Sequence, residues 1–155
     1  MSYEKITVMK RILYTLLALI LCVPMMAEDI EISPEQLPQK AQNIISKAFP
    51  DTKIKKANIE RRASLLQYEV KLAGGVKLQF RKDGGLTECE CTKHPVPDML
   101  IPAKIRKFIK IEFPENDIMR IEHDSKLYEI NLDDGTELSF NSSYRLVDID
   151  RVENK

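Results

Sequence analysis

Apolar residues at helical spacing mark two segments of this chain. In the first segment they fall on one face of a helix, at Leu37, Ala41, Ile44, Ile45, Ala48 and Phe49. A second segment, from Ile101 to Phe113, repeats that stripe. Pro38 and Pro102 suit the first helical position, where a missing N–H costs nothing, and Pro50 and Pro114 mark the exits. The pattern predicts two amphipathic helices, each bracketed by prolines.

Strict alternation of apolar and polar residues follows each helix. The clearest runs are 68–72 and 76–80 in the first half and 128–132 and 136–140 in the second, and each predicts a half-buried strand. Ala73-Gly74-Gly75 and Asp133-Asp134-Gly135 supply the turn residues of two tight hairpins. Weaker strands are predicted near 54–62 and 117–124 before the hairpins, and near 86–91 and 145–150 after them.

The two halves are copies of one unit. Leu37-Pro38 and Phe49-Pro50 recur at an offset of 64 residues, and Tyr68-Glu69-Val70-x-Leu72-x-x-Gly75 recurs at an offset of 60. The repeats span 37–91 and 101–151, joined by the proline-rich segment 94–98. Because a unit of roughly 55 residues is marginal alone, we predict one α+β domain over 28–155. In it, a helix plus a four-stranded antiparallel sheet is duplicated in tandem, and both helices cover one sheet face.

The N-terminal 27 residues have the layout of a signal peptide. Lys10 and Arg11 precede 15 uncharged residues, Ile12 to Met26, which are followed by the small residue Ala27. As a helix this run is about 22 Å long, too short for a hydrocarbon core of about 30 Å. We expect cleavage near Ala27 and a periplasmic or cell-surface protein without a membrane span. The bulky residue before Cys22 argues against a lipoprotein signal, and the start at Met1 or Met9 stays open.

Composition narrows the possible functions. The 24 basic and 24 acidic residues cancel, which disfavours nucleic-acid binding. The chain has two histidines, three cysteines and no tryptophan, so few side chains are available for catalysis or for binding a metal. We therefore predict a protein that is not an enzyme and holds no cofactor. The charge is nevertheless uneven, because repeat 37–91 has 11 basic and 6 acidic residues and repeat 101–151 has 8 and 11. The counts predict a net positive charge on the first repeat and a net negative charge on the second.

Few residues could carry metal or acid–base chemistry. Cys89 and Cys91 supply only two ligands for a four-coordinate ion, and alternate strand positions orient poorly for a disulfide. Cys89 corresponds to Ile149 in the repeat, which favours packing as a small hydrophobe. His94 and His123 have no second ligand nearby in sequence, so structural roles are favoured for both. Glu88/Asp148 and Glu90/Asp150 fall at equivalent strand positions, and their recurrence in both repeats indicates a solvated face rather than paired carboxylates for acid–base chemistry.

The polar positions of the two hairpins are the candidate binding residues. They alternate with core positions and therefore should point away from the helices. The candidates on this face are Lys71, Lys77, Gln79, Arg81, Glu129 and Glu137.

The repeated motifs resemble the PepSY-like family of exported bacterial proteins. Its signature is Leu-Pro, an amphipathic helix, Phe-Pro, then Tyr-Glu-Val-x-Leu-x-x-Gly and a Phe-containing strand, and both halves carry it at Leu37 to Phe80 and Ile101 to Phe140. One departure is Ser143-Tyr144-Arg145, which lacks the glycine of Gly85-Leu86. The resemblance implies a fold similar to β-lactamase inhibitor proteins, and with it a binding or inhibitory role.

Our hypothesis is therefore an exported, non-catalytic binding protein that modulates or inhibits an envelope protease or another enzyme. Its expected partner is another envelope protein. The alternative is a small-ligand or metal carrier that uses the core or Cys89 and Cys91.

Overall fold

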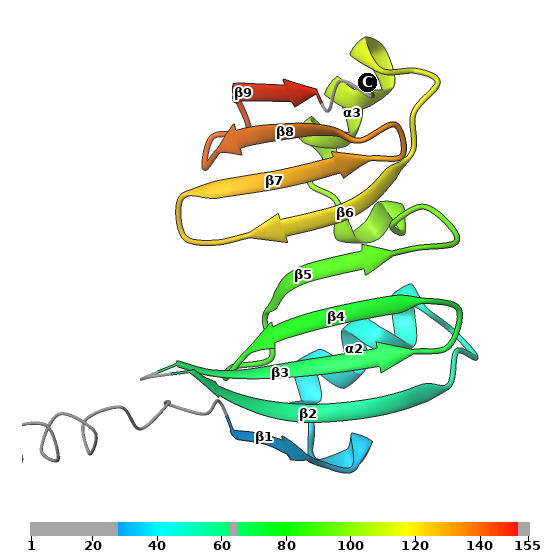
Figure 1. The fold of residues 1–155 in the computed structure, drawn as a ribbon, viewed down its shortest axis with the longest axis vertical. Helices are drawn as coiled ribbons and strands as arrows, with labels where there is room; N and C mark the ends of the chain where they lie inside the picture. The colour runs from blue at the N-terminus through cyan, green and yellow to red at the C-terminus, as the bar shows by residue number, and fades with distance from the viewer. Residues whose placement is uncertain (1–27, 63–64, 152–155) are drawn as a thin grey trace, which may run out of the picture.

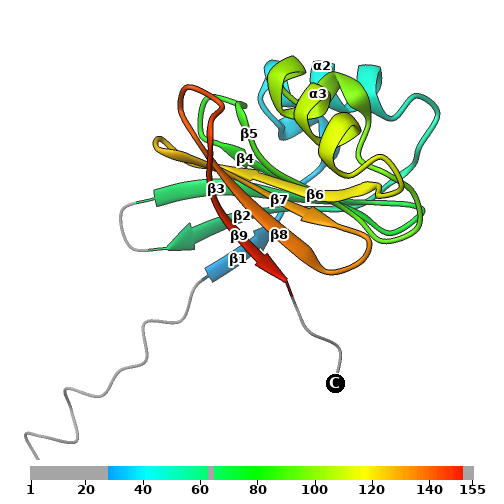
Figure 2. The ribbon, with the colours of Figure 1, turned by 90° about the horizontal axis from the view of Figure 1, so that it is seen from above.

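The protein is a single antiparallel sheet with both helices on one of its faces (Figures 1 and 2). The computed structural model describes residues 28–62 and 65–151. The sheet has nine strands, and their order across the sheet is their order along the chain. The expected signal peptide and its cleavage at Ala27 lie outside the described residues. Within the described ranges, neither helix has the length and apolar character that crossing a bilayer requires.

Each repeat forms a helix and then four strands, as predicted. The first repeat contains α2 (Gln39–Ala48), β2 (Ile54–Arg62), β3 (Leu65–Leu72), β4 (Val76–Arg81) and β5 (Leu86–Cys91). The second contains α3 (Ala103–Glu112), β6 (Ile118–His123), β7 (Leu127–Leu132), β8 (Thr136–Asn141) and β9 (Leu146–Arg151). Short 3₁₀ turns precede the helices, η1 (Pro34–Gln36) and η2 (Asp98–Leu100). The predicted α+β class and its tandem duplication are confirmed.

Two details differ from the sequence-based expectation. A ninth strand, β1 (Glu28–Glu31), pairs antiparallel with β2 and places Ile30 opposite Ile59. Its four residues are too few and too polar to give a clear strand pattern. The helices also begin one residue later than predicted, because Pro38 and Pro102 are N-caps with extended ψ angles of 139° and 133°.

The core lies between the helices and the sheet. Phe80 and Phe140, which occupy equivalent positions in β4 and β8, are both 0% exposed. The ring of Phe108 from α3 meets Phe140 edge-on, with 5.4 Å between centroids. Ile45 of α2 and Ile109 of α3 occupy equivalent buried positions above the sheet. The two halves therefore share one pattern of core side chains.

The turn between the last two strands of each repeat is built in two ways. Gly84 has φ +78°, and a Cβ there would lie 2.9 Å from Pro38 Cβ, so α2 packs directly over this glycine. Tyr144 occupies the equivalent position with φ 62°. Asn141 Oδ1 stabilises its turn by accepting from the amides of Ser143 and Arg145, at 2.9 and 3.1 Å. A glycine is therefore not required in the second repeat.

Strands β5 and β6 join the repeats into one sheet. Their register places Cys89 opposite Ile121, with Glu90 opposite Arg120. At the far end of the sheet, β9 pairs with β8 and is an edge strand.

Candidate functional site

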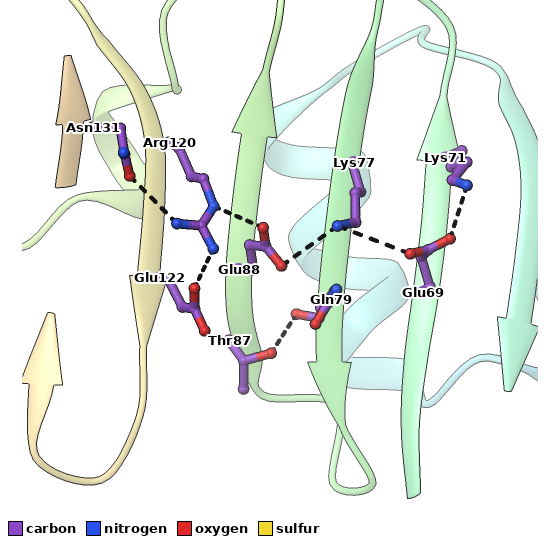
Figure 3. A network of polar contacts seen from close by, with 9 residues as sticks. All are labelled: Glu69, Lys71, Lys77, Gln79, Thr87, Glu88, Arg120, Glu122 and Asn131. Carbon is purple, nitrogen blue, oxygen red and sulfur yellow. Dashed lines mark hydrogen bonds and ion pairs between the residues drawn. The ribbon is translucent and has the colours of Figure 1, made fainter. Parts of the chain in front are cut away.

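Polar side chains on the face opposite the helices form a connected network across the sheet (Figure 3). Alternation along each strand directs core residues toward the helices and the intervening residues to this open face. The polar network, as we call it, consists of Glu69, Lys71, Lys77, Glu88, Arg120, Glu122 and Asn131, and Gln79 and Thr87 lie beside it.

Lys77 connects the strands of the first repeat. Its Nζ lies 4.0 Å from a carboxylate oxygen of Glu69 on β3 and 3.7 Å from one of Glu88 on β5. Lys71 also pairs with Glu69, at 3.1 Å. The side chain of Glu69 is 12% exposed, whereas that of Lys71 is 53% exposed. The side chain of Glu69 is therefore largely covered, and the side chain of Lys71 extends into solvent.

Arg120 connects the first repeat to the second. Its Nε donates to Glu88 Oε1 at 2.8 Å, its Nη1 donates to Asn131 Oδ1 at 3.3 Å, and its Nη2 contacts Glu122. Burial by itself would lower the pKa of Arg120, but the hydrogen bond and charge of Glu88, with those of Glu122, raise it above its ordinary value. The guanidinium thus stays charged and clamps β5 to β6.

The network continues toward the second repeat through an amide. Asn131 Nδ2 donates to Glu137 Oε1 at 2.6 Å, which extends the chain of contacts from β3 to β8. On the other side of β5, the Thr87 hydroxyl donates to the backbone carbonyl of Gln79 at 3.1 Å. Such interlocked contacts hold the polar side chains in fixed positions.

The structure distributes the six predicted binding residues unevenly. Lys71 and Lys77 belong to the polar network, and Glu137 extends it. Gln79 lies beside the network and contributes its backbone carbonyl to the contact with Thr87. Glu129 is exposed and lies opposite Glu122. Arg81 instead pairs at 3.5 Å with Asp83 in its own β4–β5 turn.

Sequence reasoning missed the centre of the network. Glu88 was interpreted as solvated, and this is wrong, because it is 6% exposed and paired with Arg120 and Lys77. The interpretation fits the equivalent Asp148, which is exposed. Arg120 could have been suspected, since a basic residue at a polar position of β6 faces the acidic positions of β5.

The two cysteines lie on the helix side of β5. Both are free thiols, 0% and 1% exposed, with their Sγ atoms 4.0 Å apart. The hydrogen bond with Cys91, together with burial, raises the pKa of the Cys89 thiol. Cys89 packs in the core as its repeat position predicted. Among residues 28–62 and 65–151, no group of three or more His, Cys, Asp or Glu side chains is placed to hold a metal ion.

Both histidines make packing contacts. His94 Nδ1 lies 3.0 Å from the carbonyl of Pro95, and its ring is 6.3 Å from that of Phe49. His123 stacks on Tyr128, with 4.1 Å between ring centroids. Burial, followed by the charge of Arg81, lowers the pKa of His123. These contacts agree with the structural roles expected from the sequence.

Comparison with known proteins places both repeats in the same family. The sequence profile of a family described as β-lactamase-inhibitor-like and PepSY-like matches residues 25–88 and again 66–148. No curated protein matches the chain.

Solved structures of three proteins from Bacteroides are similar along nearly their whole length. A protein of Bacteroides thetaiotaomicron, provisionally described as calcium-regulated and periplasmic, is 37% identical with a TM-score of 0.77, and the match covers 79% of this chain and 97% of that one. A protein of Bacteroides vulgatus, provisionally described as a periplasmic member of the DUF2874 family, is 35% identical with a TM-score of 0.78 and coverages of 80% and 98%. Another from the same organism, provisionally described as periplasmic and of unknown function, is 30% identical with a TM-score of 0.76 and coverages of 79% and 99%.

Proposed function

Because this chain belongs to the PepSY-like, β-lactamase-inhibitor-like family, we propose that it is an exported, non-catalytic protein that binds another envelope protein through the open face of its sheet. The periplasmic description of its structural relatives supports the location. The binding mode rests on one observation, the polar network that spans β3 to β8 on the face without helices.

A fixed polar face is suited to recognising a protein surface. The network residues are held by mutual hydrogen bonds and ion pairs, so fewer side chains must be ordered when a partner binds. The half-exposed side chain of Lys71 can still exchange its contact with Glu69 for a contact with a partner. Rigid placement therefore supplies specificity, and the exposed groups supply attraction.

The charge on this face changes sign from one repeat to the other. One row across the sheet begins with lysines at 56, 71 and 77 on β2 to β4, and ends with Glu137 and Asp150 on β8 and β9. Glu129 and Asp148 add exposed acids on the second repeat. A partner with the opposite arrangement would be oriented as it approaches, since complementary potentials mainly accelerate association.

The test compares two ends of the face with a matched control. The partner is first captured from the envelope by affinity purification, and its association is then measured for Lys71→Glu/Arg81→Glu and for Glu129→Lys. We expect both variants to associate roughly tenfold more slowly and to show a weaker salt dependence. Lys77 is left intact, because it lies between Glu69 and Glu88 and an acid there would face both, whereas Lys71 contacts Glu69 alone.

The control makes the same charge change on the helix layer. Lys47→Glu/Lys107→Glu reverses two exposed lysines of α2 and α3 and should leave association unchanged apart from the net charge effect. Equal rates for the control and the open-face variants would contradict docking on the open face. Inhibition is then tested by assaying the captured partner, if it is an enzyme, with and without the protein.

A further inference from the structure

Strands β5 and β9 occupy the same position in the two repeats but have different surroundings. β5 lies between β4 and β6, whereas β9 has β8 on one side and is the edge of the sheet (Figure 1). Cys89 is 0% exposed, and its counterpart Ile149 is 42% exposed. Glu88 is likewise buried, whereas its counterpart Asp148 is exposed. The chain thus contains one partnered and one open copy of the same strand.

The pairing of β5 with β6 shows which residues can lie opposite this strand. β6 places Ile121 opposite Cys89 on the helix side of the sheet and Arg120 opposite Glu90 on the open face. Arg120 also donates to Glu88 at 2.8 Å. The residue opposite Glu88 is the acid Glu122, and the guanidinium of Arg120 pairs with both carboxylates. The strand beside β5 therefore carries an apolar residue next to a basic residue, and the base neutralises the acids on both strands.

The open copy presents the same kind of surface without that strand. Ile149 lies on the helix side with Leu138, and Asp148 and Asp150 lie on the open face with Ser139 and Glu137. The amide of Ile149 donates to Asp148 Oδ1 at 3.0 Å, a contact within its own strand. In β5 the corresponding carboxylate instead binds Arg120.

From this correspondence we propose that β9 accepts an antiparallel strand from a partner protein, and that this strand alternates apolar residues with lysine or arginine. The apolar residues would cover Ile149, and the basic residues would pair with Asp148 and Asp150. The main chain of the added strand would form hydrogen bonds with the free edge of β9, as in other cases of strand addition. This inference concerns the main-chain edge of β9 and does not rest on the open-face docking proposed above, although Asp148 and Asp150 border both surfaces.

A second copy of this chain fits the edge poorly. Antiparallel pairing of two β9 strands about Ile149 would place Asp148 of one copy opposite Asp150 of the other, and pairing about Asp148 would place two Asp148 side chains together. Like charges directly opposite each other destabilise a strand pair. The other edge, β1, has the sequence Glu-Asp-Ile-Glu and is also acidic. A basic strand is therefore the better occupant.

The chain's own β6 sequence provides the probe. A synthetic peptide of residues 116–124 with the change Glu122→Lys retains the equivalents of Arg120 and Ile121 and adds a second base. We expect it to bind the purified protein and to slow amide exchange in β9. The same peptide with N-methyl groups on the alternate residues whose amides face β9 keeps its charges but cannot form the ladder, so it should bind roughly tenfold more weakly or worse.

Charge reversal on the protein gives an independent measure. Asp148→Lys/Asp150→Lys should weaken binding of the basic peptide by roughly tenfold or more, and should favour a peptide carrying Arg120→Glu and the native Glu122. The matched control Glu35→Lys/Glu112→Lys changes net charge equally at two exposed positions on η1 and α3, and should bind the basic peptide nearly as tightly as the original protein.

Three results would overturn the inference. They are equal binding of the methylated and unmethylated peptides, protection of amides elsewhere than in β9, and concentration-dependent dimerisation through β9 in place of peptide binding. Failure of the open-face variants to slow partner association would count only against the proposed function. The two hypotheses are therefore tested separately.

Discussion

The two repeats have the same core and different boundaries. Phe80 and Phe140, or Leu78 and Leu138, are buried to the same extent because both pairs lie beneath a helix on a strand with neighbours on both sides. Cys89 and Ile149 differ because only the first has a strand beyond it. Sequence position within a repeat thus determines which face a side chain occupies, whereas its exposure depends on what adjoins the repeat.

Truncation of the two equivalent phenylalanines gives the largest expected effect. Phe80→Ala and Phe140→Ala should each lower the free energy of unfolding by roughly 3–5 kcal/mol, because both rings are fully buried. Chemical denaturation of the two variants measures the loss. Two similar values would establish equivalent cores, and a loss below about 1 kcal/mol at either site would contradict that equivalence.

The glycine turn should be less tolerant than its glycine-free counterpart. Gly84→Ala combines φ +78° with a Cβ that would lie 2.9 Å from Pro38 Cβ, so we expect a loss of about 3 kcal/mol.

Tyr144→Gly relieves a φ of 62° but removes the ring contact with Tyr128 at 5.3 Å, so its loss should be about 1 kcal/mol. Thermal and denaturant melts of these two variants rank the turns. The reverse order would show that the contact between α2 and the β4–β5 turn can relax.

Equivalent acids on β5 and β9 should have unequal importance for stability. Glu88→Ala leaves Arg120 and Lys77 without their shared carboxylate, and we expect it to cost about 2 kcal/mol. Asp148→Ala at the exposed counterpart should change stability by less than about 0.5 kcal/mol. Denaturant melts measure both losses. If Glu88→Ala cost as little as Asp148→Ala, the contacts of Glu88 with Arg120 and Lys77 would add nothing to stability.

The smallest expected effect is a difference in pH response between the two turns. The amide of Gly85, which donates to Asp83 at 3.0 Å, holds the pKa of that carboxyl below its ordinary value. Its contribution to stability is therefore complete above the ordinary carboxyl pKa and disappears as the pH falls through the lowered pKa. In the second repeat Asn141 performs the same task with a neutral amide.

We expect the NMR amide shift of Gly85 to titrate in acid, and that of Arg145 to show no titration from its own turn. Asp83→Asn should remove the response of Gly85. A titration of Arg145 matching that of Gly85 would show that the observed change is global unfolding rather than a local turn effect.

The sequence predicted the elements because periodicity and prolines are local signals. Alternation identified the faces of β3, β4, β7 and β8 correctly, and the helices began within one residue of their expected start. β1 was missed because four mostly acidic residues form a strand only when the edge of β2 is present. The centre of the polar network was missed for a similar reason. Whether Glu88 is solvated depends on Arg120, which lies 32 residues away on the adjacent strand.

The consecutive strand order has a consequence for how the protein folds. Every strand pairs with its neighbours in sequence, so the sheet can grow from one end without waiting for distant segments. Folds dominated by such near contacts have low contact order and generally fold quickly. As the sheet grows from the N-terminus, β5 is its temporary edge until the segment 92–117 brings β6 into place. The interval before that pairing is when the first repeat is most exposed to misassociation.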